Sequence, residues 1–176
     1  MKKIILAALV ILCSFLLSSS NTPTPQNYLD TAVLNCDKVA GFAGNALSME
    51  LENPPIKKTG KNGEKIPMTR REIIEEKISF SEKVLEDVKN MEASPDANDI
   101  LSGSIALHRF VIEVYETDYM ALAKLYDEGA PKATIAAFDS AIKNKHASMF
   151  ELHYENLLRG GKLYASRHNI KLKWAI

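Results

Sequence analysis

Three histidines could form a metal site if the fold brought them together. His146 and His153 are seven residues apart, which places them on one face of a predicted helix, and His108 falls in the apolar seam of another. Neutral imidazole is a common ligand of zinc and copper. The Glu-x-x-His pairs of di-iron bundles and the His-Glu-x-x-His pattern of zinc enzymes are absent from the sequence. We therefore expect no metal or other cofactor, with a carrier of a metal or small ligand as the alternative. His108 should lie at the edge of the core, hydrogen-bonded to a neighbour, and the other two histidines should be half-exposed.

Basic side chains are concentrated in a long connection, Glu52 to Met68, and in the two positions that open the next helix. They are Lys57, Lys58, Lys61, Lys65, Arg70 and Arg71. Asn62-Gly63 favours a tight turn, so this connection can form a small hairpin or flap. Cations beside a helix N-terminus can hold an anionic headgroup or an acidic partner. We predict a partner-binding surface here, and the alternative is a solvated loop whose lysines only maintain solubility.

Cys36 is predicted to be a small buried residue of the first helix. Its seam neighbours Ala40 and Ala43 are also small, which favours close helix packing, and free cysteine is among the most buried residue types. A reactive thiol or an intermolecular disulfide is the alternative. Because one cysteine cannot form an internal disulfide, the fold must be stabilised by packing.

The composition argues against two classes of function. The chain has 22 basic and 22 acidic residues, and a nucleic-acid-binding domain usually has a clear basic excess. The sequence contains no Gly-x-Ser-x-Gly motif and no phosphate-binding glycine loop. We therefore expect a protein that neither binds nucleic acid nor acts as an enzyme.

The first 20 residues are typical of a signal peptide. Lys2 and Lys3 precede an apolar run from Ile4 to Leu17, and the small residues 18–20 suit a signal peptidase. This run is shorter than a membrane-spanning helix requires, and we expect no transmembrane helix in the mature chain. The protein should be exported to the periplasm or the cell surface. Attachment to lipid through Cys13 is the alternative.

Four amphipathic helices are predicted between residues 21 and 176. The first is capped by Thr24 with Pro25 behind it, and it ends before Pro54-Pro55. Its apolar residues recur at spacings of four and three: Leu29, Val33, Cys36, Ala40, Ala43 and Leu47. The second begins at a capping box, Thr69 to Glu72, and ends near Met91.

The third helix opens at Ser94-Pro95 and stops at Gly129, and the fourth follows Pro131. Gly160-Gly161 should kink the fourth helix, which then continues to about Asn169, because glycine costs about 1 kcal/mol in a helix interior. Short connections between long helices favour antiparallel neighbours. The sequence therefore predicts an all-α fold, an antiparallel up-down-up-down four-helix bundle with a long basic loop at 52–68.

The segment Tyr164-Ala165-Ser166-Arg167-His168-Asn169-Ile170 resembles the end of uncharacterised secreted or surface-located helical proteins of spirochaetes and Bacteroidetes. This resemblance implies a helical fold and an envelope location, and it implies no activity. With the observations above, it leads us to expect a binding or interaction module of the cell envelope.

Overall fold

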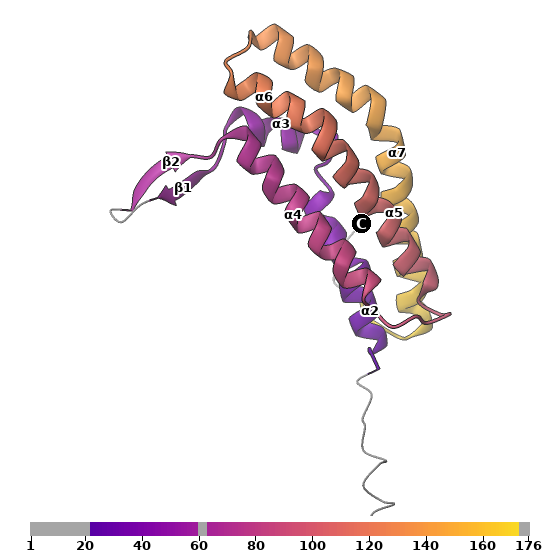
Figure 1. Ribbon diagram of the computed structural model, residues 1–176. Coiled ribbons are helices and arrows are strands. Elements are labelled where there is room, and N and C mark those ends of the chain that lie inside the picture. The colour runs from indigo at the N-terminus through magenta and orange to yellow at the C-terminus, as the bar shows by residue number, and fades with distance from the viewer. Residues whose placement is uncertain (1–21, 60–62, 173–176) are drawn as a thin grey trace, which may run out of the picture.

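The computed structural model describes residues 22–59 and 63–172, which are mostly helical (Figure 1). The predicted signal peptide, Cys13 and Lys61 lie outside the described residues, as do residues 173–176. The all-α class predicted from the sequence is confirmed at this level. One small two-stranded sheet is added to the helices.

The N-terminal segment is interrupted where the sequence predicts one helix. α2 (Pro25–Ala32) begins at Thr24, which forms a capping box with Asn27, and is followed by the 3₁₀-helix η1 (Leu34–Val39) and then by α3 (Asn45–Glu52). Between η1 and α3 the chain turns sharply, and Ala43 adopts a φ of 50°. The prediction of a continuous first helix is therefore wrong.

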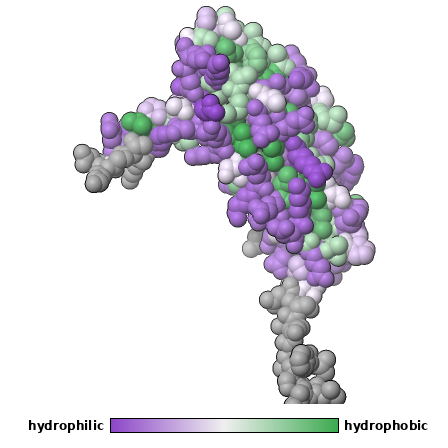
Figure 2. All heavy atoms as spheres, in the orientation of Figure 1, coloured by the Kyte–Doolittle hydropathy of each residue, from purple (hydrophilic) through white to green (hydrophobic). Residues whose placement is uncertain are grey.

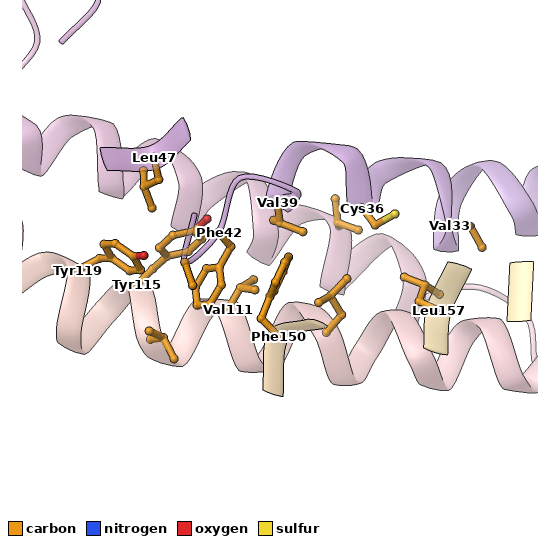
Figure 3. Packing of buried hydrophobic residues seen from close by; sticks show 14 of the residues in the cluster. Val33, Cys36, Val39, Phe42, Leu47, Val111, Tyr115, Tyr119, Phe150 and Leu157 are labelled. Atoms are coloured by element: carbon orange, nitrogen blue, oxygen red, sulfur yellow. The ribbon is translucent and has the colours of Figure 1, made fainter. Parts of the chain in front are cut away.

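The 3₁₀ geometry changes which residues of this segment are buried. A 3₁₀-helix has three residues per turn, so the buried positions recur every third residue. They are Val33, Cys36, Val39 and Phe42, which line up along the core in Figure 3. Ala40, which belongs to the predicted seam, is exposed instead. The tighter winding brings a phenylalanine into the core where the predicted pattern has only an alanine.

The predicted basic loop contains a β-hairpin. β1 (Ile56–Thr59) pairs antiparallel with β2 (Glu64–Pro67), and the register pairs Ile56 with Pro67 and Lys58 with Lys65. Gly63 has a φ of 65°, a conformation that glycine adopts without strain. A small hairpin is thus present in this connection, but its register pairs Thr59 with Glu64, which differs from the register that a two-residue turn at Asn62-Gly63 would give.

Three long helical runs make up the rest of the fold. α4 (Arg70–Lys89) begins at the predicted capping box, in which the Thr69 hydroxyl accepts from the Glu72 amide at 3.2 Å. α5 (Asn98–Val114), the π-helix η2 (Tyr115–Tyr119) and α6 (Met120–Asp127) follow one another without a break. α7 (Lys132–Arg167) is the last helix. α5 packs between α4 and α7, and α2 lies against all three.

α7 is continuous through Gly160-Gly161, so the two glycines do not interrupt the helix. The reason lies across the interface, where a Cβ atom on residue 161 would come within 2.7 Å of Val33 Cγ1. Val33 is fully buried and β-branched, so its side chain has little freedom to move away. Gly161 therefore allows the end of α2 and α7 to approach closely. This packing compensates for the low helix propensity of glycine, so α7 continues through Gly161.

Alanine substitutions at the two adjacent glycines should have opposite effects. Gly161→Ala should lower the free energy of unfolding by about 1–2 kcal/mol, because overpacking outweighs the gain in helix propensity. Gly160→Ala is the matched control. Its Cβ would meet Ile100 Cγ2 at 3.5 Å, an ordinary contact, so it should stabilise the protein by up to about 1 kcal/mol. Urea unfolding followed by circular dichroism measures both, and equal effects of the two substitutions would contradict the close approach at Val33.

Candidate functional site

The hairpin β1–β2 projects from the end of the helical body at which α3, α4 and α6 meet (Figure 1). Most of its described surface is hydrophilic (Figure 2). Two apolar side chains are nevertheless exposed on it, Ile56 at 64% and Ile66 at 37%. Lys65 is exposed as well, and its ammonium group makes no hydrogen bond or ion pair within the described residues. The hairpin therefore presents basic and apolar groups together, away from the core.

The base of the hairpin is fixed to the start of α4. The Met68 amide donates to the Pro55 carbonyl at 2.9 Å, which closes the two strands, and Met68 itself is buried. Lys57 forms an ion pair with Glu72, the same residue that completes the capping box. The hydrogen bond from Lys57 and that from the Thr69 amide hold the pKa of Glu72 below its usual range. One carboxylate thus links the hairpin to the first turn of α4.

Asp127, at the end of α6, accepts hydrogen bonds from two further backbone amides in the first turn of α4. Its two carboxylate oxygens accept from the amides of Arg70 at 3.0 Å and Arg71 at 3.1 Å. The first amides of a helix have no partner within the helix, and a carboxylate is the acceptor that best satisfies them. The start of α4 is therefore anchored to the end of α6.

The Arg70 side chain returns to the body of the protein and does not reach out along the hairpin. Its Nε donates to the Leu51 carbonyl at 2.9 Å, and its guanidinium carbon lies 5.4 Å from the centre of the Tyr126 ring. Arg71 is exposed and forms an i, i+4 ion pair with Glu75. Arg70 thus links α3, α4 and α6. Its side chain is not part of the basic surface that the hairpin exposes.

A cleft of about 660 Å³ opens beside the hairpin base, between the end of α3, the end of α6 and the start of α7. Arg70 and Tyr126 line one part of it, and Ile135, Asp139 and Ser140 of α7 line another. Desolvation raises the pKa of Tyr126, and the charges of Glu52 and Asp139 add to the effect. Sequence reasoning missed Asp127 and Asp139, because an acidic residue on a helix surface carries no signal of its tertiary partner.

The three histidines are not brought together as a metal site. His108 is fully buried in α5, and neither of its ring nitrogens has a hydrogen-bond partner within the described residues. The hydrogen-bonded neighbour expected for it is therefore not found there. His146 bonds to Asp118 at 2.6 Å, and His153 packs against Phe110. No group of three or more His, Cys, Asp or Glu side chains in the described part of the chain is placed to hold a metal ion.

Asp118 connects the π-helix η2 to α7 through two side chains, His146 and Lys145. The hydrogen bond from His146 is the main cause that holds the pKa of Asp118 below its usual range. A π-helix shifts the following residues around the helix axis, and a sequence pattern does not reveal this shift. The arrangement joins two helices at the surface.

Cys36 is 1% exposed, and its thiol is free. Burial is the main cause that raises its pKa to about 12, and this disfavours the thiolate that reactive cysteines require. The predicted structural role of Cys36 fits this environment. Tyr154 of α7 lies beside it, and burial likewise raises the pKa of that phenol to about 12.

No family model, curated protein or solved structure matches this chain. Within residues 22–59 and 63–172, no helix combines the length and the apolar character needed to cross a bilayer. The functional interpretation therefore depends on the geometry of the hairpin and of the cleft beside it.

Proposed function

We propose that this protein is an exported binding or interaction module of the cell envelope, without enzymatic activity, and that the hairpin β1–β2 is its contact surface. The observation that carries the proposal is the hairpin itself. It projects from the body on an anchored base, and it exposes Ile56, Ile66 and Lys65. Isolated hairpins are only marginally stable, so an anchored one that contributes little to the core suits recognition.

The charge of the hairpin favours an acidic protein partner. Residues 53–68 contain four lysines and one acidic residue, Glu64, so this segment has a net positive charge. Lys57 is already paired with Glu72, which leaves the exposed Lys65 of β2 to meet a partner. Complementary charge raises the association rate and fixes the register of a complex more than it raises affinity. Binding should therefore weaken as the salt concentration rises.

The strands offer a second means of recognition. β1 and β2 pair only with each other within the described residues, so each strand has one open edge. Such an edge can accept an extended segment of another protein through main-chain hydrogen bonds. Ile56 or Ile66 would then supply apolar contact on the two faces.

The body that carries the hairpin is proposed to be an antiparallel up-down-up-down four-helix bundle. The segment α2–η1–α3 counts as the first helix, and the continuous run from α5 to α6 as the third. The side-by-side packing of α4, α5 and α7 supports this, together with the short connections between them. We also propose that residues 1–20 direct export to the periplasm or the cell surface, with a lipid anchor at Cys13 as the alternative.

Charge reversal on the hairpin should abolish partner binding without changing the fold. The double variant Lys58→Glu/Lys65→Glu alters a cross-strand pair that lies outside the anchored base. We expect recovery of a chemically cross-linked envelope protein to fall by at least about tenfold, since two favourable charge contacts become repulsive. The far-ultraviolet circular dichroism spectrum should stay unchanged, because the helices do not depend on these side chains.

The matched control is Lys83→Glu/Lys162→Glu, which makes the same change of charge at exposed positions of α4 and α7. Equal recovery by the two double variants would refute the hairpin as the contact surface. Co-sedimentation of the purified protein with phosphatidylglycerol vesicles provides a further arm. If the protein bound those vesicles through its lysines and no protein was cross-linked, the partner would be an anionic headgroup and not a protein.

A further inference from the structure

We propose that the outer face of α7 pairs with the same face of a second copy of this chain, in an antiparallel homodimer. This face is separate from the hairpin, so the inference does not depend on the proposed function. α7 lies along one side of the helical body (Figure 1) and packs against α2, α5 and α6. Its buried residues recur at helical spacing and occupy one face, which leaves the opposite face to solvent.

Three large apolar side chains are exposed on this outer face. Met149, Leu152 and Leu163 are 47%, 52% and 57% exposed, and they are three of the seven large apolar side chains that are exposed in the described residues. With Asn156 and Arg159 between them, their positions repeat at spacings of three and four residues. Helices that pair in coiled coils present side chains to each other at this spacing. A single exposed apolar residue is ordinary, whereas a line of them on one helix indicates a contact surface.

The charges of the same segment are divided into an acidic half and a basic half. Glu151 and Glu155 come first along the helix, and Arg159 and Lys162 follow. All four side chains are exposed, and none of them forms an ion pair with another residue that the structure describes. Arg159 only donates a hydrogen bond to the neighbouring Asn156, at 2.6 Å. Each half therefore has free charge to offer to a partner.

The two cations that flank this segment already have carboxylate partners. Lys145 is 3.0 Å from Asp118, and Arg167 is 3.0 Å from Asp96. They do not change the division of free charge between the two halves. The outer face of α7 from Met149 to Leu163 thus has two free acidic residues followed by two free basic ones.

This order of charges favours a second copy as the occupant and an antiparallel orientation. In a two-fold symmetric pair both subunits use the same surface, so that surface must complement itself. A two-fold axis that crosses α7 near residue 157 places Leu152 opposite Leu163 of the partner subunit. The same axis places Glu155 beside Arg159 of the partner subunit, and each contact occurs twice. A parallel pair would instead bring like charges together, which disfavours association.

The dimer should be weak because the paired segment is short. Residues 149–163 span only about 21 Å at 1.5 Å per residue. Such a contact is smaller than the roughly 1,600 Å² that a standard stable interface buries, so we expect a dissociation constant of roughly 10–100 µM. Unfolding experiments at about 2 µM protein therefore measure the monomer.

Sedimentation velocity of the purified protein between about 1 and 300 µM tests the inference. The mean mass should rise from that of one chain towards that of two. Glu155→Arg and Arg159→Glu should each raise the dissociation constant at least about tenfold, because each creates two like-charge contacts. The double variant Glu155→Arg/Arg159→Glu should return it to within about threefold of wild type. An equimolar mixture of the two single variants should form a heterodimer, since their charges complement each other.

Leu163→Gln should also weaken the dimer at least about tenfold, because it removes an apolar contact that occurs twice. The matched control is Met49→Gln on α3, which replaces a side chain that is 63% exposed and lies outside α7. Lys58→Glu/Lys65→Glu should leave the dissociation constant unchanged, so failure of this inference is distinguishable from failure of the hairpin proposal. A monomeric mass at every concentration would overturn the second copy as the occupant. So would a double charge variant that does not recover the association lost in the single variants.

Discussion

Replacing Phe42 by alanine should lower the free energy of unfolding by about 3–5 kcal/mol, the usual cost of deleting a buried phenylalanine. Phe42 is 3% exposed and lies in the turn between η1 and α3. Its ring centre is 4.9 Å from that of Phe150 and 5.2 Å from that of Tyr115. It also makes edge contacts with Phe110 and Tyr119, so one ring joins α5, η2 and α7 (Figure 3).

Urea unfolding followed by circular dichroism at neutral pH measures this loss. Phe42→Leu should cost less than Phe42→Ala, because leucine keeps most of the buried volume. The control is Leu152→Ala on α7, where the leucine is 52% exposed and a change within about 0.5 kcal/mol is expected. If Phe42→Ala lowered the free energy of unfolding no more than Leu152→Ala, the burial of Phe42 in the core would be contradicted.

Acid should destabilise the protein through His108. The ring is fully buried without a partner in the described residues, and burial alone lowers its pKa from 6.5 to about 4. Between these two values the unfolded chain binds a proton that the folded chain does not. The contribution of His108 to stability is therefore fully present above pH 6.5, and it should fall by roughly 3 kcal/mol as the pH falls to 4.

The variant His108→Leu should remove this part of the pH dependence. Leucine does not titrate, and it leaves no unsatisfied polar group in the core, so stability at pH 7 should be equal or greater. Urea unfolding at several pH values between 7 and 4 provides the comparison. His153→Gln is the control, because that histidine is only half-buried and should leave the acid-induced loss in place. If wild type and His108→Leu lost the same free energy of unfolding between pH 7 and pH 4, the acid sensitivity would come from groups other than His108.

Local signals in the sequence were sufficient to predict the starts of α2 and α4 and the separation of α6 from α7. Thr24 with Pro25, and Thr69 with Glu72, satisfy free backbone amides within a few residues, and both cap their helices as predicted. Gly129, with a φ of 72°, separates α6 from α7 as predicted. These features depend on neighbours in the chain, so no knowledge of the tertiary structure was needed.

The break after α2 could not be predicted from periodicity. The apolar residues 29–47 fit one α-helix, yet the core selects a 3₁₀ winding that buries Val39 and Phe42 in place of Ala40. The energy gained by burying a phenylalanine among four rings exceeds the preference for a regular helix. At Gly161, too, tertiary packing decides the structure, because its close contact with Val33 outweighs the weak helix propensity of glycine.

The sequence by itself determined the helical class and the caps of α2 and α4, because these follow from neighbouring residues. Only the tertiary structure decided the roles of the charged side chains. It assigned Arg70 to Leu51 and Tyr126, and it placed Asp127 on the first amides of α4. It also buried one oxygen of Asp139 without a partner in the described residues. The physical reason is that an ion pair or a buried acceptor depends on distances between helices, which residue spacing along the chain does not specify.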